Sequence, residues 1–222
     1  MYFYLILIIV ISYFIGSFPS AYFITKKAVG KDIRSFGTGN VGAMNVSRAT
    51  GKSYLFFLTF LADALKGAIP VYFVKNVISI PEGTILGIEH LYIAVSLCAF
   101  GVVLGHCYSI YFKIKEGKFS GGKAIASLIG ILWVVDFYYL FLPWAAIEIL
   151  YIVATGYLFL GQFMGTVFLP FIGLVLVPEY FLLSVLCAIP VFIKQWPRFI
   201  PMLKGKEPKL YWKERGEKKE KK

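Results

Sequence analysis

The sequence predicts an all-α integral membrane protein with seven transmembrane helices, and three observations lead to this fold class. Of the 222 residues, 59% are hydrophobic and only 16% are charged, whereas a soluble domain has roughly a quarter charged residues. Long apolar runs recur along the chain, and lysine and arginine gather in alternate segments between them. One globular core cannot bury so much apolar surface, so we expect lipid to cover part of it.

The apolar runs give the expected spans, since a transmembrane helix needs roughly 20 mostly apolar residues. The first run has no basic residues before it and no small-residue cleavage site after it, so we expect a span and not a removable signal peptide. We take the breaks at Gly161–Gln162 and Pro178–Glu179 as turns; six spans would result if Trp144–Val177 held one span and a re-entrant piece. The seven expected spans are Tyr2–Ile24, Tyr54–Val74, His90–Phe112, Ala124–Phe141, Trp144–Gly161, Phe163–Val177 and Tyr180–Ile193.

The distribution of charge predicts the orientation. Basic residues concentrate in the first loop, the third loop and the carboxyl-terminal tail, while the segments between them carry acidic residues. By the positive-inside rule the amino terminus lies outside and the carboxyl terminus in the cytoplasm, which requires an odd number of spans. We therefore expect one transmembrane domain over residues 1–200, with cytoplasmic loops at 30–52 and 113–123 and a basic cytoplasmic tail over 201–222.

This topology also accounts for the formal net charge of +11. Basic residues at the cytoplasmic surface contact anionic lipid, at roughly 1 kcal/mol per residue, so membrane lipid is an expected partner and nucleic acid is not. The three cysteines, Cys98, Cys107 and Cys187, lie inside apolar runs with no CxxC pattern or histidine cluster beside them. They predict buried hydrophobic side chains and neither a disulfide nor a metal site.

A basic, glycine-rich segment from Gly30 to Arg48, GKDIRSFGTGNVGAMNVSR, predicts an anion site at the cytoplasmic face. Its glycines can adopt positive φ and expose backbone amides, and successive exposed amides bind anions. Its asparagines add donors, and its arginines present planar guanidinium groups that suit phosphate. A plain interfacial connector is the alternative. The residues concerned are Arg34, Gly37, Gly39, Asn40, Gly42, Asn45 and Arg48.

A second polar cluster lies on the same side. Gly121, Gly122 and Lys123 lead into the fourth expected span, and a helix amino terminus favours a phosphate. His106, near the inner end of the third span, suits either a structural hydrogen bond or catalysis.

An ionisable pair, Asp63 and Lys66, occupies the second expected span. The three-residue spacing puts both on one helix face, so we expect either mutual neutralisation or an active-site role in which Lys66 reaches toward the inner loop. Glu148 stands alone in the fifth span and receives no assignment.

These clusters resemble the signatures of the bacterial acyl-phosphate-dependent glycerol-3-phosphate acyltransferases, and the similarity covers the chain from end to end. The first signature is specific enough to make chance a poor explanation. The matching segments are GSFPS at 16–20, DIR at 32–34, GTGN at 37–40, GAMN at 42–45 with Arg48, DALKG at 63–67, GH at 105–106 and FSGGKAIAS at 119–127.

The resemblance implies a seven-span inner-membrane enzyme of phospholipid synthesis. Such an enzyme moves an acyl group from an acyl phosphate to the 1-hydroxyl of glycerol 3-phosphate, giving lysophosphatidate and inorganic phosphate, with no metal, nucleotide or other cofactor. We expect Thr38, Asn45 and Arg48 to be catalytic. Substrate binding is expected at Arg34, Gly37, Gly39, Asn40, Gly42, Lys66, His106, Gly121, Gly122, Lys123 and Glu207.

The first two signatures also show departures from the family pattern. Thr38 stands at a usual serine, Met44 at a usual threonine and Ala124 at a usual glycine. Glu116 and Gly117 lengthen the link between the two halves of the second signature.

The third signature, near residues 195–207, departs further. Gln195 stands at the usual histidine, Arg198 at the usual asparagine and Pro201 at the usual arginine, so a histidine base at that position is absent. Two alternatives therefore stay open beside the expected reaction. One is the same fold acting on another polyol phosphate, or catalytically impaired; the other is a small-anion membrane transporter.

Overall fold

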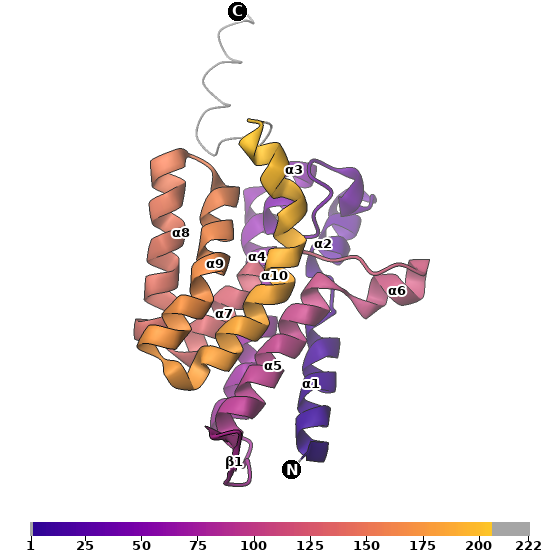
Figure 1. Cartoon of the computed structure of the whole chain (residues 1–222). Coiled ribbons are helices and arrows are strands. Elements are labelled where there is room, and N and C mark those ends of the chain that lie inside the picture. Colours follow the sequence, from indigo (N-terminus) through magenta and orange to yellow (C-terminus); the bar gives the residue numbers. More distant parts are fainter. Residues whose placement is uncertain (1, 206–222) are drawn as a thin grey trace, which may run out of the picture.

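The computed structural model describes residues 2–205 of the chain, which form a bundle of helices with one short β-hairpin (Figure 1). In chain order the elements are α1 (Tyr2–Gly16), α2 (Ser20–Val29), the 3-10 turn η1 (Ile33–Ser35), α3 (Ala43–Thr50), α4 (Ser53–Asn76), β1 (Thr84–Ile85), β2 (Ile88–Glu89), α5 (His90–Cys107), α6 (Ile110–Glu116), α7 (Ile125–Val135), the π-helical turn η2 (Phe137–Phe141), α8 (Leu142–Thr155), α9 (Leu158–Leu176), the 3-10 turn η3 (Pro178–Tyr180) and α10 (Phe181–Leu203).

Within residues 2–205, six helical segments are long and apolar enough to cross a membrane, by length and composition. The expected fourth span, Ala124–Phe141, is present only as the 11-residue helix α7 followed by η2, and η2 continues into α8. A helix of 11 residues rises about 17 Å, which is shorter than the roughly 30 Å hydrocarbon core. The six segments are Tyr2–Val29, Ser53–Asn76, His90–Cys107, Phe137–Thr155, Leu158–Leu176 and Pro178–Leu203.

Two expected spans are interrupted near the same level of the bundle. The first breaks at Ser17–Pro19, because a proline ring removes a backbone donor and keeps the preceding residue out of the helical region. The third ends at Cys107 instead of Phe112, and Tyr108 adopts φ −133° and ψ 66°, which are not helical angles. The chain then leaves sideways as α6, away from the bundle (Figure 1).

The helix α5 lies at the centre of the bundle and packs against α1, α4 and α10. Two-thirds of its apolar window (67%) is buried inside the protein, more than in any other candidate span of the described residues, so α5 is the one least able to face lipid. Further contacts join α4 to α7 and α8 to α9. Small residues line these contacts and let the backbones approach closely, which is the usual packing device inside membranes. They include Gly16 and Gly105 between α1 and α5, Gly67 and Gly130 between α4 and α7, and Gly161 and Gly165 between α8 and α9.

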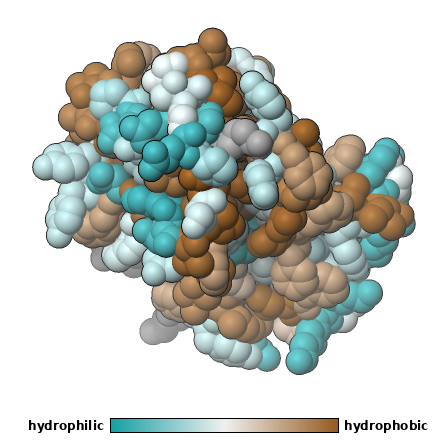
Figure 2. All heavy atoms as spheres, turned by 90° about the horizontal axis from the view of Figure 1, so that it is seen from below, coloured by the Kyte–Doolittle hydropathy of each residue, from teal (hydrophilic) through white to brown (hydrophobic). Residues whose placement is uncertain are grey.

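Charge separates the two ends of the bundle. The hairpin end, which also holds the amino-terminal end of α1, carries the acidic side chains Glu82, Glu89, Asp136 and Glu179. Seen from this end, hydrophilic residues gather in patches among hydrophobic ones (Figure 2). The opposite end, with α3 and the carboxyl-terminal end of α10, carries most of the basic residues of the described chain (Figure 1).

Candidate active site

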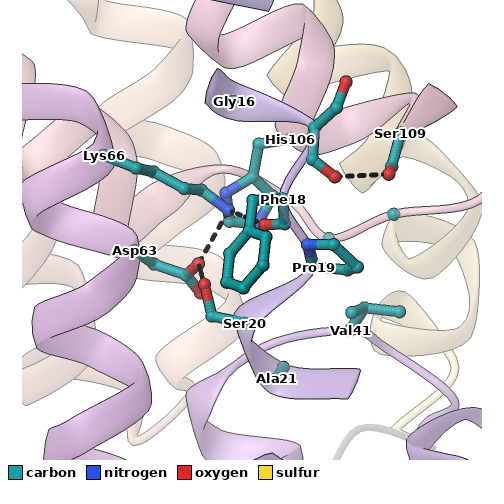
Figure 3. A pocket seen from close by; sticks show the side chains of 13 residues that line it. Gly16, Phe18, Pro19, Ser20, Ala21, Val41, Asp63, Lys66, His106 and Ser109 are labelled. Carbon is teal, nitrogen blue, oxygen red and sulfur yellow. Dashed lines mark hydrogen bonds and ion pairs between the residues drawn. The ribbon is translucent and has the colours of Figure 1, made fainter. Parts of the chain in front are cut away.

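A pocket opens where the break between α1 and α2 meets α4, the end of α5 and the segment before α7 (Figure 3). With Val41 of the loop 30–52, it brings together parts of five segments that are separate in the sequence. Its lining consists of Gly16, Ser17, Phe18, Pro19, Ser20, Ala21, Val41, Asp63, Lys66, His106, Ser109, Gly121 and Gly122.

The backbone carbonyls exposed by the break accept hydrogen bonds from side chains of other segments. Lys66 Nζ donates to the Phe18 carbonyl oxygen at 3.0 Å, and Ser109 Oγ donates to the Ser17 carbonyl oxygen at 2.5 Å. An unsatisfied carbonyl at membrane depth costs several kcal/mol, so these two contacts allow the helix to be interrupted there.

The pair of Asp63 and Lys66, expected from their spacing, is present at 2.7 Å between Lys66 Nζ and Asp63 Oδ1. Asp63 Oδ1 also accepts a hydrogen bond from Ser20 Oγ at 2.9 Å. Figure 3 shows both α4 side chains pointing toward the Ser17–Ser20 segment. The pair is thus neutralised and, at the same time, holds the start of α2 in place.

His106 is buried and takes part in a chain of hydrogen bonds that reaches α4. Ser127 Oγ donates to the backbone carbonyl of Asp63 at 2.8 Å, so the same oxygen accepts from His106 Nδ1 at 2.9 Å. This network assigns the proton to Nδ1 and leaves Nε2 as a hydrogen-bond acceptor. A side chain at Gly122 would collide with His106 Nε2, which shows that the glycine lies directly against the acceptor nitrogen.

The two glycine-rich loops meet at this point. A Cβ at Gly122 would also collide with the carbonyl oxygen of Val41, which belongs to the loop 30–52. Gly122 N donates to the His106 carbonyl oxygen at 3.0 Å, so this amide is hydrogen-bonded within the protein. The helix α7 begins only at Ile125, after Ala124 in a left-handed conformation with φ 58°. The two glycines therefore precede the helix and do not form its amino terminus.

Within the loop 30–52, Asn45 acts as the organising side chain. Its amide nitrogen donates to three backbone carbonyl oxygens, of Ile33 at 3.1 Å, Phe36 at 3.0 Å and Asn40 at 3.0 Å. Its Oδ1 is buried and has no hydrogen-bond partner within residues 2–205. A Cβ at Gly37 would lie 2.6 Å from this oxygen, so the loop needs a glycine there.

Of the three glycines expected to support the anion site, Gly37, Gly39 and Gly42, two have the expected positive φ. Gly37 has φ 49° and Gly39 has φ 68°. The expectation is wrong for Gly42, whose φ of −163° is extended because this residue precedes the first turn of α3.

Arg34 is held in an ion-pair network. Its guanidinium Nη2 lies 2.5 Å from Asp32 Oδ2 and 2.5 Å from Glu116 Oε1, and the group stacks 4.5 Å from the centre of the Phe112 ring. Hydrogen bonds from Arg34 hold the pKa of both the Asp32 and Glu116 carboxyls below their usual values. Glu116 belongs to the lengthened link, so the added residues provide the second carboxylate of this network.

Thr38 and Arg48, both expected to be catalytic, lie exposed on the loop and do not line the pocket. Lys123 is buried, and its ammonium group lies 4.6 Å from the centre of the Phe159 ring, with the Arg198 guanidinium 5.2 Å from the same centre. Cationic groups of α10 and of the segment before α7 thus gather at one ring. Glu207 lies outside the described residues.

No role was predicted from the sequence for the serines that connect these segments: Ser17, Ser20, Ser109 and Ser127. The available signal was the Ser-Phe-Pro-Ser interruption of an otherwise apolar first run.

Known proteins are similar to this chain over nearly its whole length. A model of the family "Glycerol-3-phosphate acyltransferase" matches residues 6–205. The chain belongs to the glycerol-3-phosphate acyltransferase family. The chain is 35% identical to the glycerol-3-phosphate acyltransferase of Staphylococcus saprophyticus over 210 residues, covering 94% of this chain and 98% of that protein. It is 36% identical to the one of Staphylococcus carnosus over 211 residues, with the same coverage.

Two solved structures have a similar fold. The crystal structure of PlsY (YgiH), an integral membrane glycerol 3-phosphate acyltransferase, in its glycerol 3-phosphate form has a TM-score of 0.76 and 25% identity. The match covers 92% of this chain and 94% of PlsY. The lysophosphatidic acid form matches with a TM-score of 0.73. This member of the acyltransferase family is therefore an all-helical, multi-span membrane protein.

Proposed function

We propose that this chain transfers an acyl group from an acyl phosphate to the 1-hydroxyl of glycerol 3-phosphate, releasing lysophosphatidate and inorganic phosphate for phospholipid synthesis. The observation that supports this most is the convergence of four separate motif segments of the family on one pocket of the bundle. The named relatives and the glycerol 3-phosphate form of PlsY support the acceptor.

The reaction needs positioning more than activation. An acyl phosphate is a mixed anhydride, so its carbonyl carbon is already electrophilic. The glycerol hydroxyl oxygen forms a bond to that carbon, the bond from the carbon to the phosphate oxygen breaks, and the hydroxyl proton passes to the departing phosphate. Holding the two substrates in line and stabilising the negative charge can supply most of the rate enhancement.

In this proposal the contacts with substrate come from the loop 30–52, from Lys123 and from His106. Arg48 and Lys123 bind phosphate groups, Thr38 orients a substrate oxygen, and Asn40 donates to the acyl carbonyl. His106 Nε2 accepts a hydrogen bond from a glycerol hydroxyl.

Other expected site residues act by positioning these groups. The Asn45 amide nitrogen donates to three loop carbonyls, and Arg34 forms ion pairs with two carboxylates. Lys66 forms an ion pair with Asp63 and donates to the Phe18 carbonyl. The glycines at 37, 39, 42, 121 and 122 shape the backbone, and Glu207 keeps the substrate-binding role that the resemblance implies.

We also propose seven spans, with the 11-residue α7 as the short one, an external amino terminus and a cytoplasmic active site in the inner membrane. The basic end of the bundle, which holds the loop 30–52, supports this orientation. The three native cysteines are buried, so single cysteines can be introduced at Lys31 and at the fully exposed Leu86. A membrane-impermeant thiol reagent should label Leu86→Cys in intact cells and Lys31→Cys only after permeabilisation; the reverse pattern would invert the topology.

The activity is tested by following phosphate release from palmitoyl phosphate by the purified protein in the presence of glycerol 3-phosphate. Arg48→Ala should lower kcat/KM by about 100-fold, as expected when one charged contact in the transition state is lost. Lys52→Ala, an exposed cation at the end of the same loop, is the matched control. No release by the native chain would refute the function, and equal release by Arg48→Ala would refute the role of Arg48.

A second candidate, the same chemistry on another polyol phosphate, is favoured by Arg198. This cation stands where the family usually has asparagine, and it shares the Phe159 ring with Lys123. Transfer to other polyol phosphates without transfer to glycerol 3-phosphate would establish it.

A further inference from the structure

The lengthened link in the second signature, residues 109–120, forms a loop that projects from the bundle. Ser109 N donates to the Ser120 carbonyl oxygen at 2.9 Å and closes its base, and α6 extends from there to the side of the bundle (Figure 1). The root of α6 is fixed by Phe112, which is fully buried against the Tyr22 ring at 5.4 Å between ring centres. The outer part is exposed and carries lysine together with apolar side chains, including Ile114 at 79% and Phe119 at 50% exposure.

Two lysines from different helices converge beside this root. Lys26, in the last turn of α2, lies 3.4 Å from the hydroxyl oxygen of Tyr22, and Lys115 of α6 donates to the same oxygen. Their ammonium groups are therefore at most about 7 Å apart. Two like charges so close to each other favour an anion between them.

The neighbouring carboxylates are largely used by another cation. Glu116 Oε1 lies 3.6 Å from Lys115 Nζ, but both Glu116 oxygens accept from the Arg34 guanidinium, at 2.7 and 2.5 Å. Arg34 also donates hydrogen bonds to both carboxylate oxygens of Asp32. One guanidinium thus binds two carboxylates and leaves one negative charge beside the two ammonium groups, so the cluster as a whole stays positively charged.

Directly beside the lysine pair lies a strip of exposed aromatic rings. Phe23 stacks on Phe18 with 5.3 Å between ring centres and contacts Tyr111 at 5.2 Å. Phe18 is 55% exposed and Phe23 is 39% exposed, on the outer surface of a segment that is apolar enough to span the membrane. Lys26 lies close to the end of that segment, where the headgroups of a bilayer lie.

We propose that Lys26 and Lys115 bind the phosphate of an anionic phospholipid of the surrounding bilayer, whose acyl chains lie along the Phe18–Phe23–Tyr111 strip. The Tyr22 hydroxyl holds the two ammonium groups at a spacing that one phosphate can bridge. The exposed Ile114 and Phe119 of this projecting loop enter the membrane interface beside the bound lipid, as amphipathic elements do.

The site is tested on the purified full-length protein by native mass spectrometry and by thermal unfolding, with phosphatidylglycerol titrated against a phosphatidylcholine background. Lys26→Gln with Lys115→Gln should weaken phosphatidylglycerol binding by about 30-fold, because each basic residue near an anionic surface is worth on the order of fivefold. Lys27→Gln with Lys204→Gln removes the same charge from exposed positions outside the cluster and should leave binding nearly unchanged.

Three outcomes would overturn the proposal. One is equal binding by the two double variants, which would reduce the effect to net charge. Another is no preference for phosphatidylglycerol over phosphatidylcholine. The third is a preference for lysophosphatidate or inorganic phosphate that the Lys26 and Lys115 variant loses, since the site would then serve a substrate or product. Tyr22→Phe, which removes only the shared hydroxyl, should weaken binding less than the double variant does.

Discussion

The Lys66 ammonium group lies 2.7 Å from Asp63 Oδ1 and donates at 3.0 Å to the carbonyl oxygen of Phe18, so one side chain of α4 serves both a carboxylate and a broken helix. Both charged side chains are nearly inaccessible, at 9% for Lys66 and 3% for Asp63. Lys66→Met should therefore destabilise the protein by about 3–5 kcal/mol, because it leaves a buried carboxylate without its counter-charge. Thermal unfolding in detergent checks this.

The matched control is Lys52→Met, at the exposed start of α4, which should unfold close to the native temperature. The double change of Asp63→Leu with Lys66→Met should cost less than Lys66→Met alone, since no buried charge remains. Identical unfolding of Lys66→Met and Lys52→Met would contradict the role of the pair.

The contact between Arg34 and Glu116 predicts a pH dependence of stability. Arg34 lowers the pKa of Glu116 in the folded protein below the ordinary value of about 4.3. The carboxylate therefore contributes stability that is complete above that ordinary value and is lost as the pH falls through the lowered one. Glu116→Gln should be less stable than the native chain at pH 6, and the difference should narrow below about pH 4.

Unfolding temperatures at a series of pH values measure this effect. Glu82→Gln, at the opposite end of the molecule, controls for the loss of a surface carboxylate. A gap between Glu116→Gln and the native chain that stays constant down to pH 3 would show that the stability does not come from the ionised Glu116 carboxylate.

Ala124 occupies a backbone conformation that disfavours any side chain. Its φ of 58° is left-handed, which costs roughly 1–2 kcal/mol for a residue with a Cβ. Replacement by glycine, the usual family residue, removes this strain and loses one buried methyl group worth about 0.8 kcal/mol. Ala124→Gly should thus leave the unfolding temperature unchanged or raise it.

Ala94→Gly provides the comparison, because Ala94 is fully buried in the interior of α5. That change should destabilise by about 1–2 kcal/mol, from the lost methyl group and the lower helix propensity. A similar loss at both positions would mean that Ala124 is not strained.

Gln195, at the position of the usual family histidine, faces α9. Its Nε2 donates to Thr166 Oγ1 at 3.2 Å, and its Oε1 has no partner in the described part of the chain. Thr166 keeps its own bond to the Gln162 carbonyl at 2.8 Å when the amide is removed. Gln195→Met should therefore change stability by less than about 1 kcal/mol and acyl transfer by less than about twofold.

A drop in acyl transfer of 100-fold or more with unchanged stability would place Gln195 at the reaction instead. Gln195→His tests the converse, since a gain in rate would show that the family histidine contributes chemistry that this chain lacks.

Much of the fold could be predicted from composition, because the lipid bilayer requires long apolar segments to be helical. Apolar runs of about 20 residues predict helices wherever a bilayer surrounds them, and α4 matches its expected span within two residues at each end. The interruptions were harder to predict. Pro19 marks the first one in the sequence, but the donors that make it tolerable are Lys66 and Ser109, which only tertiary packing brings near.

The candidate site also has features that the sequence predicts and features that it does not. Glycine positions with left-handed φ, Gly37 and Gly39, follow from local backbone preferences. Side-chain roles do not, because a residue type shows only what it is able to bind. Arg34 suits phosphate by its chemistry, and Asn45 suits a substrate carbonyl, yet the fold gives both of them protein partners.

The interruption between α1 and α2 has a consequence for membrane insertion. The donors for the Ser17 and Phe18 carbonyls come from residues 109 and 66, which leave the ribosome much later. Until then the Ser17 carbonyl lacks its Ser109 donor, and the Phe18 carbonyl has only the Ser20 amide of its own segment, at 3.1 Å. We therefore expect the segment Tyr2–Val29 to acquire its final form only when α4 and the end of α5 pack beside it.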